Sequence, residues 1–149
     1  MQYDPQSILI VEDEEAHAEL TRRAIRKSGN ASRIDVVHDG EEALDYLFSR
    51  GKYSHKDEFP SPGLILLDIK LPGIDGIEVL RQIKQDPVLK RIPVIMLTTS
   101  KREEDIAASY NHYANSYLTK PVGFKEFEAK IREIDHYWMS LNQPPDGME

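Results

Sequence analysis

Five short apolar runs, each of strand length, recur along the chain and alternate with longer amphipathic segments. The runs cover residues 7–11, 34–37, 64–67, 94–97 and, more weakly, 116–118. Their apolar character is nearly continuous, which is typical of strands that are covered on both faces of a parallel sheet. The alternation therefore predicts an α/β fold with a doubly wound parallel sheet built from right-handed βαβ units.

Capping signals and apolar spacing predict a helix after each run. The first helix covers about residues 14–28, and Gly29 ends it. The next three each open with a polar N-cap that has a Glu three residues later, at Asp39, Asp75 and Ser100. Pro87 marks the end of the third helix. The fifth carries large apolar residues at three- and four-residue spacing: Phe124, Phe127, Ile131, Ile134, Trp138 and Leu141.

The composition is that of one globular domain. The chain has 149 residues, of which 40% are hydrophobic and 30% charged, so we expect a single domain over 1–149. Its core should lie at about 7–141, with a flexible tail at 142–149 and no output domain. The net charge of −7 argues against binding to nucleic acid.

Neither a secretory nor a membrane segment is visible in the sequence. No basic and apolar leader opens the chain, and the apolar runs are far shorter than the roughly 20 residues of a membrane span. The chain has no cysteine, which excludes disulfides and thiolate metal sites. We therefore expect a soluble, cytoplasmic protein without membrane contact.

Polar residues follow the ends of the predicted strands. For five strands the common order is 2-1-3-4-5, and ligands of such sheets bind at the carboxyl ends of the strands. That order brings together the residues after strands 1, 3, 4 and 5, which are Glu12, Asp13, Asp68, Thr98 and Lys120. Carboxylates gathered in this way need compensating positive charge, and oxygen ligands favour a hard cation of the Mg²⁺ type. The group suits phosphoryl transfer, with lysine and metal facing a phosphoryl group.

A combination of motifs, in this order along almost the whole chain, carries a resemblance to a known family. The motifs are Glu12-Asp13, Asp68 with Leu71-Pro72-Gly73 and Asp75-Gly76, Thr98, and Lys120-Pro121. The sequence resembles the receiver domain of two-component response regulators, over about residues 7–141. The resemblance implies the flavodoxin-like (CheY-like) (βα)5 sandwich with the strand order 2-1-3-4-5.

The resemblance also implies roles for single residues. By it, Asp68 is the phosphoacceptor, while Asp13 and the backbone carbonyl of Lys70 join it as Mg²⁺ ligands and Glu12 holds the ion through water. Thr98 and Tyr117 are the implied switch pair, and Lys120 is the implied catalytic lysine, followed by a cis peptide bond before Pro121. Four neighbours are expected to modulate the reaction: Lys70, Thr99, Ser100 and Pro121, although Ser100 is foremost a helix cap.

The implied function is that of a stand-alone phosphoaspartate switch, which catalyses its own phosphorylation and dephosphorylation and is not a conventional enzyme. Asp68 takes a phosphoryl group from a sensor histidine kinase, and the output runs through protein contacts. Expected partners are a histidine phosphotransfer protein or a downstream target, and a second copy bound through helices 4 and 5. Several traits resemble the single-domain receivers of phytochrome kinases, although similar stand-alone receivers serve other sensor kinases. They are Tyr113 where the family often has Gly, a long polar loop at 51–63, Asp86-Pro87, and Thr98-Thr99-Ser100.

Three other readings compete with this one. A flavodoxin-like electron carrier needs a phosphate-cradling loop after the first strand, whereas this chain has an acidic run there. A haloacid-dehalogenase-type phosphatase expects a second carboxylate two residues after the nucleophile, where Lys70 stands. A phosphorylation-independent binding module on the same fold stays open. The five histidines show no metal-ligand spacing, so we assign them packing or solvated roles.

Overall fold

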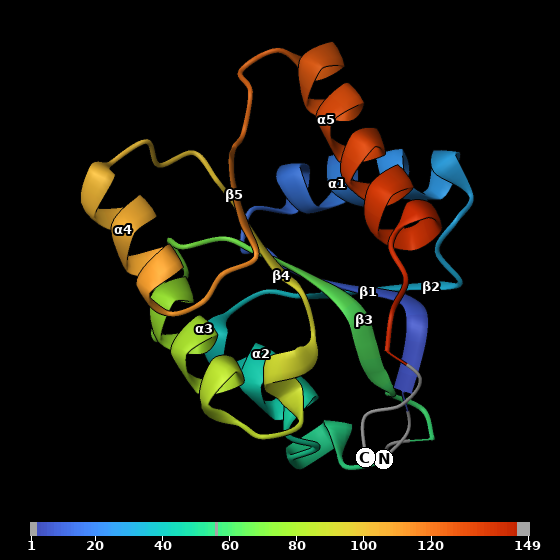
Figure 1. Ribbon diagram of the computed structural model, residues 1–149, viewed down its shortest axis with the longest axis vertical. Helices are drawn as coiled ribbons and strands as arrows, with labels where there is room; N and C mark the ends of the chain where they lie inside the picture. The colour runs from blue at the N-terminus through green and yellow to red at the C-terminus, as the bar shows by residue number, and fades with distance from the viewer. Residues whose placement is uncertain (1–2, 56, 146–149) are drawn as a thin grey trace.

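A five-stranded parallel sheet forms the centre of the molecule (Figure 1). The structure is a computed structural model that describes residues 3–55 and 57–145. The strand order is β2-β1-β3-β4-β5, which confirms the order expected from the sequence. The strands are β1 (Tyr3–Val11), β2 (Arg33–Val37), β3 (Ser61–Leu67), β4 (Val94–Thr98) and β5 (Ser116–Thr119).

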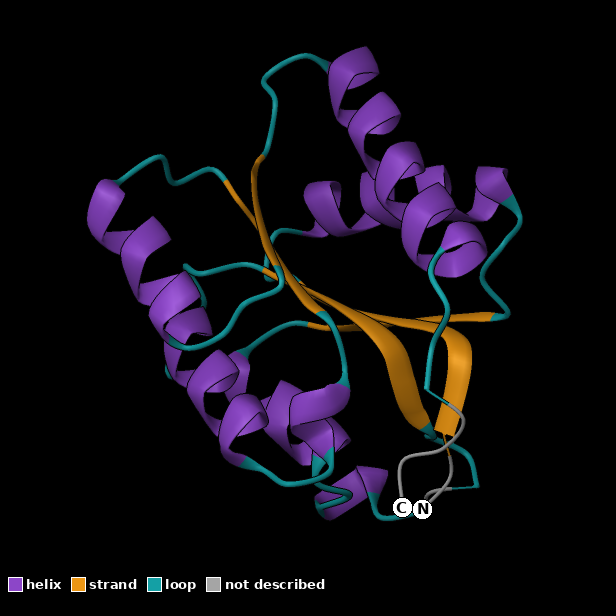
Figure 2. Ribbon diagram, viewed as in Figure 1, coloured by secondary structure: helices purple, strands orange, loops and turns teal. Residues whose placement is uncertain are grey.

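Helices cover both faces of this sheet. Figure 2 shows α1 and α5 on one face and α2, α3 and α4 on the other. The bounds are α1 (Glu15–Ser28), α2 (Gly40–Leu47), α3 (Gly76–Gln85), α4 (Glu103–Asn111) and α5 (Phe124–His136). The predicted doubly wound (βα)5 sandwich is confirmed. Among the described residues, no helix is long and apolar enough to cross a membrane.

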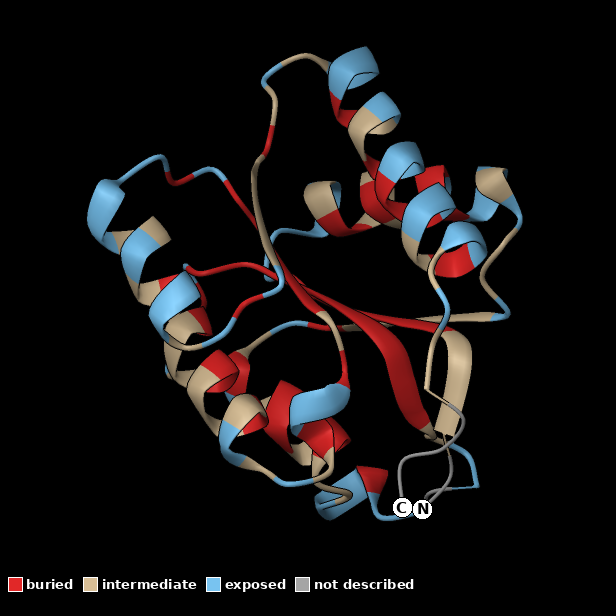
Figure 3. Cartoon of the chain, viewed as in Figure 1, coloured by how far each residue is buried: buried red, intermediate tan, exposed pale blue. Residues whose placement is uncertain are grey.

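The hydrophobic core is divided into two parts by the sheet. Successive residues of β1 point to opposite faces, so that Leu9 packs with the residues beneath α2 and α3 while Ile10 packs with those beneath α1 and α5. Figure 3 shows the central strands buried along most of their length. All seven residues of β3 are buried, and this explains why its sequence is apolar without alternation. The residues at the strand ends are therefore positioned by strands that are buried in the core.

Local signals fixed several helix ends as predicted. The carboxylate of Asp39 accepts a hydrogen bond from the backbone N–H of Glu42 at 2.7 Å, and that of Asp75 accepts one from Glu78 at 2.9 Å. Gly29 ends α1 with a φ of 73°, a left-handed conformation that glycine adopts without strain. These contacts satisfy backbone groups that the helix itself leaves unpaired.

Two predictions near the fourth and fifth strands are wrong. Ser100 is not the N-cap of α4, because the helix begins at Glu103 with Arg102 in the capping position. The Ser100 hydroxyl instead donates to the Asp105 carboxylate at 2.5 Å, an ionised acceptor that binds it more strongly than a neutral one. The peptide bond before Pro121 is trans, since the described part of the chain has no cis peptide bond. The trans form is the lower in energy before proline by about 0.5–1 kcal/mol.

The segments at the ends and the long loop differ from expectation in detail. The fifth helix ends at His136, and a π-helical turn follows over Tyr137–Leu141. The loop predicted at 51–63 ends at residue 60, because β3 begins at Ser61. It contains a 3-10 turn over Gly51–Tyr53, in which Tyr53 is buried and donates to Glu42 at 2.6 Å. Residue 56 of this loop and residues 146–149 of the predicted tail lie outside the described residues.

Candidate functional site

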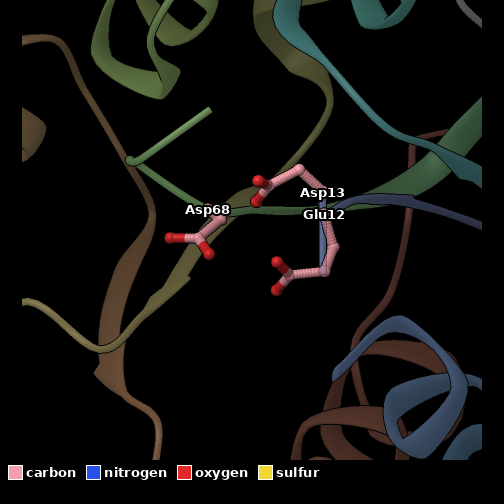
Figure 4. A group of neighbouring side chains, drawn as sticks. All are labelled: Glu12, Asp13 and Asp68. Carbon is pink, nitrogen blue, oxygen red and sulfur yellow. The ribbon is translucent and has the colours of Figure 1, made fainter. Parts of the chain in front are cut away.

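Three acidic side chains meet where β1 and β3 end. Glu12 and Asp13 directly follow β1, and Asp68 directly follows β3. One carboxylate oxygen from each lies within 4.8 Å of the others. Figure 4 shows the three carboxylates turned toward a common space. Glu12 and Asp68 are buried while Asp13 is exposed, so the group opens to solvent on one side.

Backbone hydrogen bonds continue past the strand ends and hold these residues in register. The N–H of Glu12 donates to Val37 at 3.0 Å, and that of Asp68 donates to Val11 at 3.1 Å. The backbone N–H of Lys120 donates to the carbonyl of Thr98 at 2.7 Å. The site residues are therefore extensions of the sheet rather than parts of free loops.

A close approach of α3 fixes the backbone beyond Asp68. The N–H of Gly76 donates to the carbonyl of Ile69 at 2.7 Å. A side chain at Gly76 would collide with the backbone of Asp68, so glycine is the residue that this approach allows. The first turn of α3 and the end of β3 are thus locked together.

Lys120 supplies the positive charge within the acidic group. Its side chain is 3% exposed, and its ammonium donates to Glu12 and, at 3.0 Å, to Oδ2 of Asp68. Oδ1 of Asp68 accepts the backbone N–H of Ile69 at 2.7 Å. Both oxygens of Asp68 are therefore oriented, one by a backbone donor and one by the ammonium.

Burial dominates the electrostatics of Glu12. Desolvation raises the pKa of Glu12 to about 7, although the ammonium of Lys120 acts in the opposite direction. The neighbouring charge of Asp68 raises this pKa further. Two buried carboxylates face one ammonium here, so the group favours an additional cation. Three carboxylate oxygens within a few ångströms fit a hard divalent ion such as Mg²⁺ or Mn²⁺.

The predicted switch residues lie beside this group, on β4 and β5. Thr98 is fully buried, and its hydroxyl oxygen accepts the N–H of Ser100 at 3.3 Å. The Tyr117 hydroxyl donates to the backbone carbonyl of Ser100 at 2.9 Å. Ser100 thus connects the two residues. Lys70 and Thr99 are exposed and Pro121 is half-buried, all three flanking the site in the chain.

Two histidines that were not predicted as site residues lie at the site. Nδ1 of His17 lies 3.1 Å from the Lys120 ammonium, and Nδ1 of His38 lies 3.2 Å from the backbone oxygen of Glu12. No local pattern marks His17, which lies in the first turn of α1 and reaches Lys120 only through the packing of that helix. His38 follows the edge strand β2, whose residues we expected to stay outside the group.

A parallel sheet of this order, with an acidic group and a lysine at the carboxyl ends of its strands, defines a receiver-type signalling domain. The family model of the response regulator receiver domain matches residues 8–132, and the chain belongs to this family. It is therefore a receiver of a two-component phosphorelay, a phosphoacceptor signalling protein rather than a conventional enzyme. The family assignment excludes the two alternative functions of an electron carrier and a phosphatase.

Similar proteins include two regulators of nearly the same length. The chain is 42% identical over 142 residues to the probable methanogenesis regulatory protein FilR2 of Methanothrix harundinacea, covering 95% of this chain and 89% of that protein. It is 42% identical over 135 residues to the response regulator Rcp1 of Synechocystis sp., covering 91% and 90%.

Two solved structures have the same fold. The Mn²⁺-bound form of Rcp1 matches with a TM-score of 0.88 and 40% identity, covering 95% of this chain and 99% of that one. The phosphorylated cyanobacterial phytochrome response regulator RcpA matches with a TM-score of 0.89, 40% identity and the same coverage. A divalent metal and a phosphorylated state are thus both found among receivers similar to this chain.

Proposed function

We propose that Asp68 is the phosphoacceptor and that it takes its phosphoryl group from a sensor histidine kinase. The observation that carries this proposal is the Asp68 carboxylate itself, oriented by the Ile69 N–H and the Lys120 ammonium beside two further acids. A carboxylate held in this way is a positioned nucleophile, and the ammonium faces the charge that develops on a phosphoryl group.

In the transfer, an oxygen of Asp68 forms a bond to phosphorus while the bond between phosphorus and the kinase imidazole nitrogen breaks. The imidazole keeps the electron pair and takes up a proton. Lys120 stays charged and draws the phosphoryl oxygens toward itself. Water later attacks the acyl phosphate, which releases phosphate and restores the Asp68 carboxylate.

Mg²⁺ is the proposed cofactor. Asp13, Asp68 and the backbone carbonyl of Lys70 would hold it, with Glu12 acting through water. When bound, the ion neutralises negative charge on the phosphoryl oxygens. The support is the convergence of three carboxylates, together with the Mn²⁺-bound form of the similar regulator Rcp1.

The phosphoryl group would change the surface through Thr98 and Tyr117. A new group with three acceptor oxygens attracts the Thr98 hydroxyl, and the Tyr117 ring follows into the space beside it. The contact of Tyr117 with Ser100 supports this path, because it connects the site to the start of α4. We expect Lys70, Thr99, Ser100 and Pro121 to modulate the rates.

The proposed output is a change in protein contacts made by α4, β5 and α5. The kinase partner would be of the phytochrome type, as the similarity to RcpA suggests. Further partners would be a histidine phosphotransfer protein or a downstream target, and a second copy of the chain bound through α4 and α5. A cytoplasmic location is part of the same proposal.

Intact mass after incubation with Mg²⁺ and a small acyl-phosphate donor tests the proposal. We expect one phosphoryl adduct, which is lost in Asp68→Asn and in the presence of a chelator. Asp57→Asn, which removes an exposed carboxylate outside the site, should keep the adduct. A folded wild-type protein that takes no adduct from either the donor or a cognate kinase would instead favour the phosphorylation-independent binding module.

A further inference from the structure

The Lys120 ammonium has three N–H groups and almost no access to water. Its side chain is 3% exposed, so its donors must find partners within the protein. Glu12 and Asp68 accept two of them. The third acceptor within reach is Nδ1 of His17, at 3.1 Å. His17 therefore completes the hydrogen bonding of a buried charged group.

Nδ1 of His17 also lies 2.9 Å from Oε2 of Glu14. The two contacts exclude one another, because Nδ1 accepts from Lys120 only without a proton and donates to Glu14 only with one. The Glu14 side chain is 61% exposed, so water can replace the imidazole as its partner. Lys120 has no such replacement, and an unpaired buried donor is strongly unfavourable. The imidazole thus carries its proton on Nε2 and offers Nδ1 to Lys120.

The backbone of His17 is held within α1, and its ring packs against α5. The backbone carbonyl of His17 accepts the Thr21 hydroxyl at 2.8 Å within α1. Its ring lies beside that of Phe127 of α5, with the ring centres 6.3 Å apart. The imidazole is therefore held at the point where α1 and α5 approach the end of β5.

We propose that His17 is a positioning residue for Lys120, acting as the neutral acceptor that fixes the rotation of the ammonium. With one N–H held by His17, the other two are directed at Glu12 and Asp68. When Asp68 carries a phosphoryl group, the same anchor keeps an N–H aimed at a phosphoryl oxygen. This role rests on the proposed function of Asp68 and Lys120.

Phosphorylation rates of three variants test the role. His17→Leu keeps an apolar contact with Phe127 but has no acceptor, and we expect its phosphorylation rate constant to fall about tenfold, the effect of losing one hydrogen bond to a charged group. His17→Asn carries an acceptor at the same δ position, so its rate should stay within about twofold of wild type. His55→Leu removes an exposed imidazole far along the chain and should change nothing.

A second measurement needs no phosphoryl donor. In nitrogen-15 NMR spectra of the unphosphorylated protein, the Lys120 ammonium should give a resolved signal protected from exchange, weakened in His17→Leu and kept in His17→Asn. An unchanged signal in His17→Leu overturns the proposal, as does a wild-type rate in His17→Leu or a rate in His17→Asn as low as in His17→Leu. If the wild type takes no phosphoryl group at all, the proposed function fails and His17's part in the reaction fails with it, whatever the NMR signal shows.

Discussion

At the scale of single residues, the buried carboxylates differ in what compensates them. Glu12 and Asp68 share the ammonium of Lys120. Asp135, on the last turn of α5, is 1% exposed and has an amide as its partner, since Nδ2 of Asn30 donates to it at 2.9 Å. The C-terminal end of a helix also disfavours a negative charge. The buried carboxylate of Asp135 therefore lowers the stability of the folded protein.

The burial of Asp135 predicts how its contribution to the free energy of unfolding depends on pH. Burial raises the pKa of Asp135, while Asn30 and Ser28 oppose the shift. Because its pKa is raised, Asp135 binds its proton more tightly in the folded state than in the unfolded state. The stabilisation of the folded state by this proton is complete below the unfolded pKa and is lost as pH rises through the folded pKa. Asp135→Asn should therefore stabilise the protein by about 1 kcal/mol at pH 7 and by less at pH 4.

Urea unfolding of Asp135→Asn at the two pH values measures this effect. Asp57→Asn, at an exposed position, serves as the control and should shift neither curve. A gain that is equal at both pH values, or larger at pH 4, would contradict the assignment.

At the scale of elements, the contact between α3 and the end of β3 is the tightest support of the site. Gly76→Ala would place a methyl group against the Asp68 carbonyl. We expect a loss of about 2 kcal/mol in the free energy of unfolding, because overpacking forces the backbone to shift. The shift should also slow phosphorylation, since it moves Asp68.

Gly73→Ala is the matched control for Gly76→Ala. Gly73 has a φ of +73° but open space around it, so alanine there should lower stability by about 1 kcal/mol through backbone strain alone. The phosphorylation rate of Gly73→Ala should stay near that of the wild type. Equal rates in both variants would mean that the close approach of α3 does not hold Asp68.

The helix ends show which parts of the fold a sequence can predict. The caps at Asp39 and Asp75 were predicted because both partners of each contact lie within three residues in the chain. The predicted cap at Ser100 is wrong, because α4 begins at Glu103 after Arg102; the Ser100 hydroxyl accepts the N–H of Arg102 at 3.3 Å before the helix and donates to Asp105. Tyr113 adopts a φ of 67°, a left-handed conformation, which accounts for the glycine common in the family at this position.

The residues of the candidate site also differ in whether the sequence predicts them. Glu12, Asp13, Asp68 and Lys120 were predicted to converge because the strand order alone places the strand ends side by side. His17 was not predicted, because its contact with Lys120 depends on how α1 packs against α5 and β5. Such packing is set by side chains far apart in the chain, and no local pattern encodes it.

At the scale of the whole molecule, the apolar side chains of α5 and the turn after it divide into a buried set and an exposed set. Phe127, Ile131 and Ile134 are buried in the core beneath α1 and α5, so most of the regular spacing is explained by ordinary packing. What remains exposed are Phe124, Tyr137 and Leu141 at the two ends of this segment, and Tyr110 and Tyr113 at the end of α4. Self-association through α4 and α5 is a proposal, and these exposed side chains are the positions at which variants test it.

The last prediction concerns this surface. If the chain dimerises through α4 and α5, then Tyr110→Arg combined with Leu141→Arg should weaken the dimer at least about tenfold, because buried like charges replace apolar contacts. Val122→Arg, at a fully exposed apolar residue in the loop before α5, should leave it unchanged. Sedimentation velocity at several concentrations, with and without Mg²⁺ and phosphoryl donor, measures both the dimer and its response to phosphorylation. Equal weakening by Val122→Arg would place the contact at the loop, and a monomer under all conditions would leave the output to other partners.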